Sequence, residues 1–134
     1  MSDYTEEQLD GIWQKGISIR GVDANIYRLD VAGAVMKREL YGNEGNLGWE
    51  VDHIYPKEKL KANKVPEARW SDIMNLRPMN AKNNVAKGEA YPIYDVAVQR
   101  KGQLMSNEEV DGVVGIVDVD LQQKIKEHYK AWLS

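Results

Sequence analysis

The chain has 134 residues, of which 43% are apolar and 29% are charged, and its formal net charge is −3. This length and composition fit a single folded domain with a hydrophobic core and exclude a disordered chain. Cysteine is absent, which excludes disulfides, thiolate catalysis and zinc held by cysteine. No apolar run is as long as a membrane span and the first residues are acidic, unlike a leader peptide, so we expect a cytoplasmic protein without a membrane partner.

The first third of the chain predicts a helix followed by strands. Residues 5–8 (TEEQ) have the capping-box pattern, which predicts a helix from there to about Lys15. The expected buried face of this helix consists of Leu9, Ile12 and Trp13. Residues 25–42 alternate loosely between apolar and polar side chains, which predicts strands with a turn at Gly33.

The middle of the chain predicts the order strand, loop, strand, helix. Residues 48–55 form an apolar run that Pro56 ends, as is typical of a strand. We expect a long basic loop over residues 56–74, with a helical turn among its lysines. The apolar segment 75–79 predicts a second strand, and residues 80–88 predict a short helix with an asparagine at its start and a glycine at its end.

Residues 91–99 (YPIYDVAVQ) predict a strand, and residues 106–109 (SNEE) form a second capping-box pattern. Residues 118–133 predict a helix with Asp118 or Asp120 as its N-cap. The apolar stripe of this helix consists of Leu121, Ile125, Tyr129 and Trp132. Such a stripe fits a partner-binding helix, but we favour packing on the helix's own domain, and we expect His128 to be a solvated helix residue.

Basic charge is concentrated in one quarter of the chain. Residues 53–87 hold eight Lys and Arg against three Asp and Glu, whereas residues 1–52 hold five against ten. A solvated loop has such a composition, and so does a surface that binds a polyanion such as nucleic acid.

The pair Asp52-His53 lies in the middle of the apolar run, where neither residue is a usual filler. A surface aspartate beside a paired histidine is the plain interpretation of these two residues, but the sequence around and after them favours another. The segments GWEVDHIYP (48–56) and NLRPMNAKNNVAKGE (75–89), in this order, resemble the HNH endonuclease family. The upstream segment YRLDVAGAVMKRELYG (27–42) is similar to the lead-in of one bacterial and phage branch of that family.

The resemblance implies an α+β fold class with a ββα-metal core. We expect one HNH nuclease domain over residues 1–134, with this core at 47–88. Residues 1–46 are then an N-terminal support of helix and strands, and residues 89–134 are a C-terminal strand-helix extension.

The resemblance also assigns roles to individual residues. His53 corresponds to the general base that deprotonates the attacking water, a role that suits imidazole at neutral pH. Asp52 and Asn84 correspond to ligands of a divalent metal, and Asn75 corresponds to the residue that braces the loop and helps to hold the catalytic histidine. Asn83 is the alternative to Asn84, and the register of the helix favours Asn84.

One divalent cation is the implied cofactor. Oxygen ligands from Asp and Asn favour Mg²⁺ or Mn²⁺, with Zn²⁺ or Ni²⁺ as alternatives. Many relatives also bind a structural zinc through two CxxC pairs, but here Asn80 and Asn83 flank the helix start, so we expect no structural zinc.

DNA is the implied partner, with RNA left open. The expected phosphate contacts, each of which alone also fits solvated surface, are Lys57, Lys59, Lys61, Arg77, Lys82 and Lys87. A homodimer or a larger nuclease or packaging assembly is an open question. The alternative function is a catalytically silent module that binds nucleic acid or docks in a restriction or phage-packaging assembly.

Overall fold

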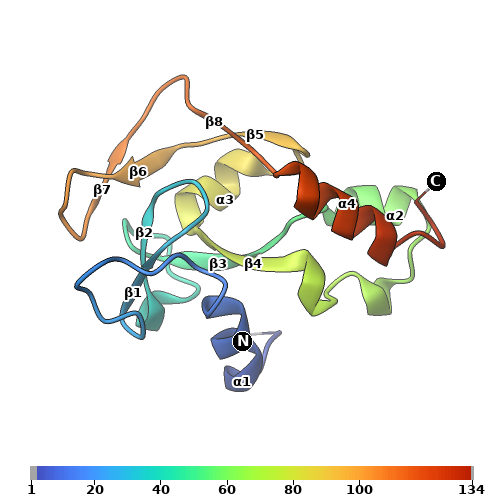
Figure 1. Ribbon diagram of the computed structural model, residues 1–134, viewed down its shortest axis with the longest axis horizontal. Coiled ribbons are helices and arrows are strands. Elements are labelled where there is room, and N and C mark those ends of the chain that lie inside the picture. The colour runs from blue at the N-terminus through green and yellow to red at the C-terminus, as the bar shows by residue number, and fades with distance from the viewer. Residues whose placement is uncertain (1–2, 134) are drawn as a thin grey trace.

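The computed structural model describes residues 3–133, which form an α+β fold of helices and small antiparallel sheets (Figure 1). The α-helices are α1 (Glu6–Trp13), α2 (Lys57–Ala62), α3 (Ala81–Lys87) and α4 (Val119–His128). The strands are β1 (Tyr27–Leu29), β2 (Val35–Lys37), β3 (Trp49–His53), β4 (Leu76–Asn80), β5 (Ile93–Asp95), β6 (Val98–Arg100), β7 (Asn107–Glu109) and β8 (Val114–Ile116). In this part of the chain, no helix has the length and apolar character needed to cross a bilayer.

At the centre of the molecule, β3, β4 and α3 supply two paired strands and a helix. The two strands pair antiparallel, with Trp49 opposite Asn80 and His53 opposite Leu76. The Asn80 side chain accepts a hydrogen bond from the Lys82 amide and caps α3 at its start. Gly88 ends the helix with φ +50°, a conformation that suits glycine because it lacks a Cβ. These elements were all expected from the sequence.

The segment between β3 and β4 is more ordered than the expected basic loop. The lysine run forms α2, and two 3-10 helices lie beyond it at Glu67–Arg69 and Ile73–Asn75. Leu60 of α2 is fully buried, which anchors this segment in the core.

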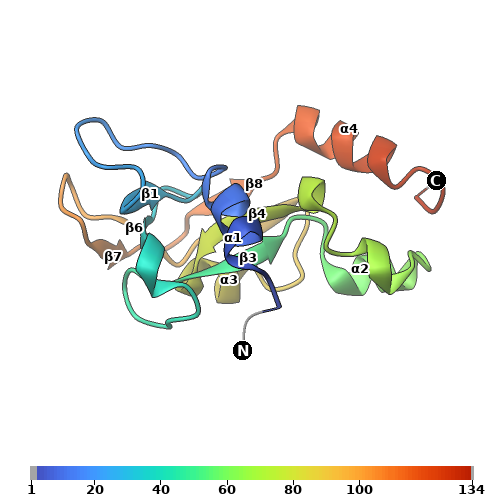
Figure 2. The same cartoon turned by 90° about the horizontal axis from the view of Figure 1, so that it is seen from below.

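A first hydrophobic cluster joins α1 to the central strands. The capping box of Thr5 and Gln8 is present, as expected. The cluster contains Leu9, Ile12, Trp13, Met36, Trp49 and Leu76. Figures 1 and 2 show α1 on one side of the β3–β4 pair and α3 on the other, so the two strands lie between helices.

A second cluster joins α4 to the rest of the molecule. Ile125 and Tyr129 of the expected apolar stripe are buried in it, and Leu121 and Trp132 pack against it. Asp118 is the N-cap of α4 and accepts a hydrogen bond from the Leu121 amide. The prediction that this helix packs on its own domain is therefore confirmed.

Three expectations for the C-terminal third are wrong. The SNEE pattern at 106–109 does not cap a helix, because β7 pairs with β6 there and the Asn107 side chain bonds to the backbone of Val35. Residues 91–99 form two strands in separate sheets rather than one, so the extension contains β5 to β8 before its helix. His128 is not simply solvated, because its Nε2 lies 2.9 Å from Oδ2 of Asp72.

Candidate active site

Four of the predicted site residues, Asp52, His53, Asn84 and Lys57, line one surface hollow of about 470 Å³. Asp52 and His53 come from the end of β3, and Asn84 comes from the middle of α3, which packs against β3. Glu50 and Glu58 line the same hollow. The ββα arrangement therefore brings together side chains from elements that are far apart in the sequence.

Asp52 is the counterion of two buried cations. It is opposite Arg77 in the strand register, and its Oδ2 accepts a hydrogen bond from Arg77 Nε at 2.9 Å. Its Oδ1 lies 3.1 Å from Lys87 Nζ. The side chains of all three residues are at most 8% exposed. Burial lowers the pKa of Lys87, and the nearby Asp52 carboxylate opposes this shift.

Arg77 has one further contact besides its ion pair with Asp52. Its guanidinium carbon lies 5.5 Å from the centre of the Tyr94 ring, a cation–π contact. Its Nη2 is buried without a hydrogen-bond partner among residues 3–133. This buried nitrogen therefore remains a donor without an acceptor in the described part of the chain.

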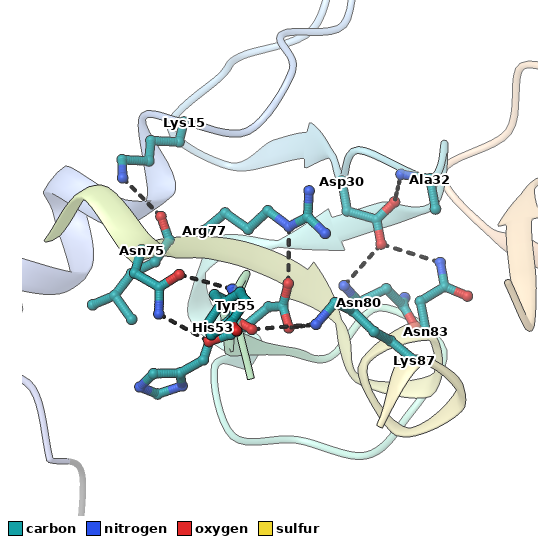
Figure 3. Close-up of polar contacts among 12 residues, drawn as sticks. Lys15, Asp30, Ala32, His53, Tyr55, Asn75, Arg77, Asn80, Asn83 and Lys87 are labelled. Carbon is teal, nitrogen blue, oxygen red and sulfur yellow. Dashed lines mark hydrogen bonds and ion pairs between the residues drawn. The ribbon is translucent and has the colours of Figure 1, made fainter. Parts of the chain in front are cut away.

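The environment of His53 keeps its imidazole neutral. Burial, together with the smaller effect of the neighbouring Lys57, lowers the pKa of His53 to about 4. A neutral imidazole has one nitrogen with a free lone pair, which a proton acceptor needs. Figure 3 shows the His53 ring turned away from the cluster around Asp30. The Nε2 atom lies 2.9 Å from Oγ of Ser71, a partner that no pattern in the sequence indicated.

Asn75 connects the end of β3 to the loop that precedes β4. Its Oδ1 accepts a hydrogen bond from the Tyr55 amide at 2.8 Å, and its Nδ2 donates to the Tyr55 and Trp70 carbonyls. Its own carbonyl accepts from the Ile54 amide at 2.9 Å. The residue is fully buried, and these bonds hold the backbone immediately after His53.

The start of α3 is held by a hydrogen-bond network centred on Asp30 (Figure 3). One oxygen of Asp30 accepts from the amides of Ala32 and Ala34, and the other accepts from the Asn80 amide and the Asn83 side chain. Burial raises the pKa of Asp30, and these hydrogen bonds oppose the shift. No pattern in the sequence marks Asp30, because its partners Asn80 and Asn83 lie 50 and 53 residues away.

Asn83 and Asn84 have different surroundings. Asn83 is fully buried, and its amide also bonds to the backbone of Ala97 and Val98. Asn84 is only half-buried, lines the hollow, and its side chain forms no hydrogen bond with any described residue. Of the two, Asn84 is therefore the one that is free to bind a ligand.

The six residues expected to contact phosphate fall into two groups. Lys57, Lys61 and Lys82 are exposed and Lys59 is half-buried. Arg77 and Lys87 are instead buried against Asp52, where a phosphate on the surface does not reach their charged groups.

Asp52 and Asn84 fit a hard divalent cation by their chemistry. The Asp52 oxygens each use one lone pair for a cation partner and keep another, and the Asn84 amide oxygen is free. Arg77 and Lys87 lie beside the carboxylate and oppose a further positive charge, so a metal held here would bind weakly. Among the described residues, no group of three or more His, Cys, Asp or Glu is arranged to hold a metal.

Comparison of the chain with known protein families, with curated proteins and with solved structures found no match.

Proposed function

We propose that this chain is a divalent-metal-dependent endonuclease of the HNH type that hydrolyses phosphodiester bonds in DNA. The observation that carries the proposal is the shared hollow, in which a carboxylate, a neutral imidazole and a free amide oxygen meet at the junction of two strands and a helix. This arrangement agrees with the resemblance of residues 48–56 and 75–89 to that family.

In this proposal, water attacks the phosphorus and passes its proton to His53, while the bond to one bridging oxygen breaks and that oxygen takes a proton from solvent. His53 suits the role because it is neutral at pH 7. Asn75 keeps the imidazole in place through its bonds to the adjoining backbone. Asp52 and Asn84 would hold the cation, which would supply positive charge to stabilise the leaving oxygen.

Lys57 is the cation best placed to attract the phosphate, because it is exposed and lines the same hollow. Lys61 lies one helical turn further along α2, and Lys82 lies in the first turn of α3. We infer that these lysines guide DNA to the hollow, while Arg77 and Lys87 act through Asp52.

One observation favours a second candidate, a catalytically silent module that binds nucleic acid or docks in a larger assembly. Both oxygens of Asp52 are engaged by cations of the chain itself. If those ion pairs exclude metal, the hollow still binds polyanions through its lysines but does not cleave them.

Incubation of the purified protein with supercoiled plasmid in Mg²⁺, Mn²⁺, Zn²⁺ or EDTA separates the two candidates. The nuclease proposal predicts nicked circles with Mg²⁺ or Mn²⁺ and none with EDTA. An identical preparation of the His53→Ala variant controls for contaminating nucleases. Binding to the plasmid without cleavage in any of the metals would favour the silent module.

A further inference from the structure

Ser71 is the one side chain that hydrogen-bonds the ring of the candidate base, as far as residues 3–133 show. Its Oγ lies 2.9 Å from Nε2 of His53, across 18 residues of sequence. The other ring nitrogen, Nδ1, has no hydrogen-bond partner among the described residues. The two nitrogens of this imidazole therefore have different surroundings.

This difference matters because a neutral imidazole carries its proton on only one nitrogen. If Nε2 carries the proton and donates to Ser71, the lone pair of Nδ1 is left to accept a proton from water. If Ser71 donates to Nε2 instead, the lone pair needed for catalysis is already occupied. The direction of this single hydrogen bond thus decides which nitrogen acts as the base.

The Ser71 hydroxyl has a second hydrogen-bond neighbour. Ser71 also hydrogen-bonds the phenol of Tyr4, which opposes the rise in the pKa of Tyr4 that burial causes. A hydroxyl that donates to the Tyr4 oxygen presents its lone pairs to His53. In that arrangement His53 Nε2–H donates to Ser71, and Ser71 donates to Tyr4.

The residues on both sides of Ser71 are anchored by hydrogen bonds, although Ser71 itself is exposed. Asn75 Nδ2 donates to the carbonyl of Trp70, the preceding residue. The next residue, Asp72, accepts hydrogen bonds from Arg69 Nε at 2.6 Å and from His128 Nε2 at 2.9 Å. His128 belongs to α4, so the C-terminal helix helps to place the serine.

From these contacts we propose that Ser71 is a positioning residue for His53: it accepts a hydrogen bond from Nε2–H and so leaves Nδ1 as the proton acceptor. The catalytic role of Ser71 rests on the proposed nuclease function. The tautomer of His53, in contrast, can be measured without any cleavage of DNA. Hydrogen-bond partners of metal-binding histidines typically change metal affinity or activity about 10- to 100-fold when they are removed, and we expect an effect of similar size for a partner of the base.

The test uses protein with ¹⁵N-labelled histidine, without metal, near pH 7. Long-range proton–nitrogen correlation spectra show which ring nitrogen carries the proton, and the His53→Gln variant identifies the His53 signals. We expect the Nε2–H tautomer in wild type and in Ser71→Thr, which keeps the hydroxyl, and a mixture of tautomers in Ser71→Ala. Plasmid nicking should fall about 10- to 100-fold in Ser71→Ala and recover in Ser71→Thr, with metal affinity unchanged.

An Nδ1–H tautomer in wild type would overturn the proposal, and so would a Ser71→Ala spectrum identical to that of wild type. A wild-type protein that fails to nick DNA would count against the nuclease function. In that case the spectra would still decide whether Ser71 sets the tautomer.

Discussion

Asp52 is both a candidate metal ligand and the counterion of Arg77 and Lys87. Its removal therefore affects more than metal binding, because two buried cations lose the carboxylate that pairs with them. A loss of activity in Asp52→Ala alone would not separate a missing ligand from a disturbed fold.

We predict that Asp52→Ala lowers the free energy of unfolding by about 3–5 kcal/mol, the range for a buried ion pair that loses one partner. Urea denaturation of the variant measures this change. Glu58→Ala is the matched control, because Glu58 lines the same hollow but is exposed, and its effect should be within about 0.5 kcal/mol. Equal effects for the two variants would show that the buried ion pairs do not stabilise the protein.

The surroundings of His53 also determine how it responds to pH. Because burial lowers its pKa from 6.5 to about 4, the unfolded chain takes up a proton at His53 in a range where the folded protein does not. The stability that neutral His53 contributes is therefore fully present above pH 6.5 and is lost as the pH falls through 4.

We predict that the ring signals of His53 in NMR spectra of the metal-free folded protein stay constant between about pH 7 and pH 5, because the folded-state pKa lies near 4. The corresponding signals in urea should titrate near 6.5. Cleavage should likewise show no loss from His53 protonation in this range. A midpoint near 6.5 in the folded protein would show that the hollow does not shield the imidazole as the structure indicates.

At the scale of single elements, α3 presents two adjacent asparagines to different surroundings. Asn83 bonds into the network that joins α3 to Asp30 and to the backbone of residues 97 and 98. Asn84 lines the hollow. Since the two residues are chemically identical, they form a matched pair for separating stability from metal binding.

We predict that Asn83→Ala destabilises the protein by on the order of 3 kcal/mol, because several buried polar groups lose their partners. Asn84→Ala should leave stability unchanged or slightly increased, since alanine favours a helix more than asparagine does. Calorimetric titration with Mn²⁺ should show weaker binding for Asn84→Ala. Weaker metal binding in a folded Asn83→Ala protein and unchanged binding in Asn84→Ala would place the ligand one residue earlier.

The elements that depend on local sequence were predictable. The capping box at residues 5–8 precedes apolar residues at helical spacing, and a helix forms there. The same pattern at 106–109 forms a strand, because Asn107 bonds to Val35 and Asn46, which lie 72 and 61 residues away. Such long-range partners leave no mark in a single sequence.

The same limit applies to the site. The resemblance of residues 48–56 and 75–89 to the HNH family led us to expect Asp52, His53 and Asn84 near one another. The burial of Arg77 depends on the strand register, which sets it opposite Asp52. The Ser71 hydrogen bond depends on how the 3-10 segments fold back, which composition and spacing do not encode.

At the scale of the whole molecule, the net charge is negative, yet the proposed ligand, DNA, is a polyanion. The net charge of −3 repels DNA at a distance, so binding has to depend on the local positive charge of α2 and its neighbours. The position of charge, rather than its total, is then what controls affinity.

We predict that reversing Lys57, Lys59 and Lys61 to glutamate weakens DNA binding for all sequences. The slope of the logarithm of the DNA-binding constant against the logarithm of the salt concentration should also become shallower. We expect a change of about 0.9 for each phosphate that the variant no longer neutralises. Fluorescence anisotropy with a labelled duplex at several salt concentrations measures both.

The matched control for this variant reverses Arg20, Lys101 and Lys126 to glutamate. These residues are exposed and lie outside residues 53–87, so the control has the same net charge as the α2 variant. Equal reductions of affinity in the two triple variants would mean that net charge rather than the α2 lysines determines binding.

The single-turnover rate of plasmid nicking by His53→Ala, at a metal concentration that saturates the wild type, tests the central claim most directly. Asp52 and Asn84 are untouched in this variant, so calorimetry should show metal binding close to that of wild type. The rate should fall by about 10²–10⁴-fold, the range for loss of a positioned proton acceptor. A rate equal to that of wild type would show that His53 is not the base, and loss of metal binding would show that it is a ligand instead.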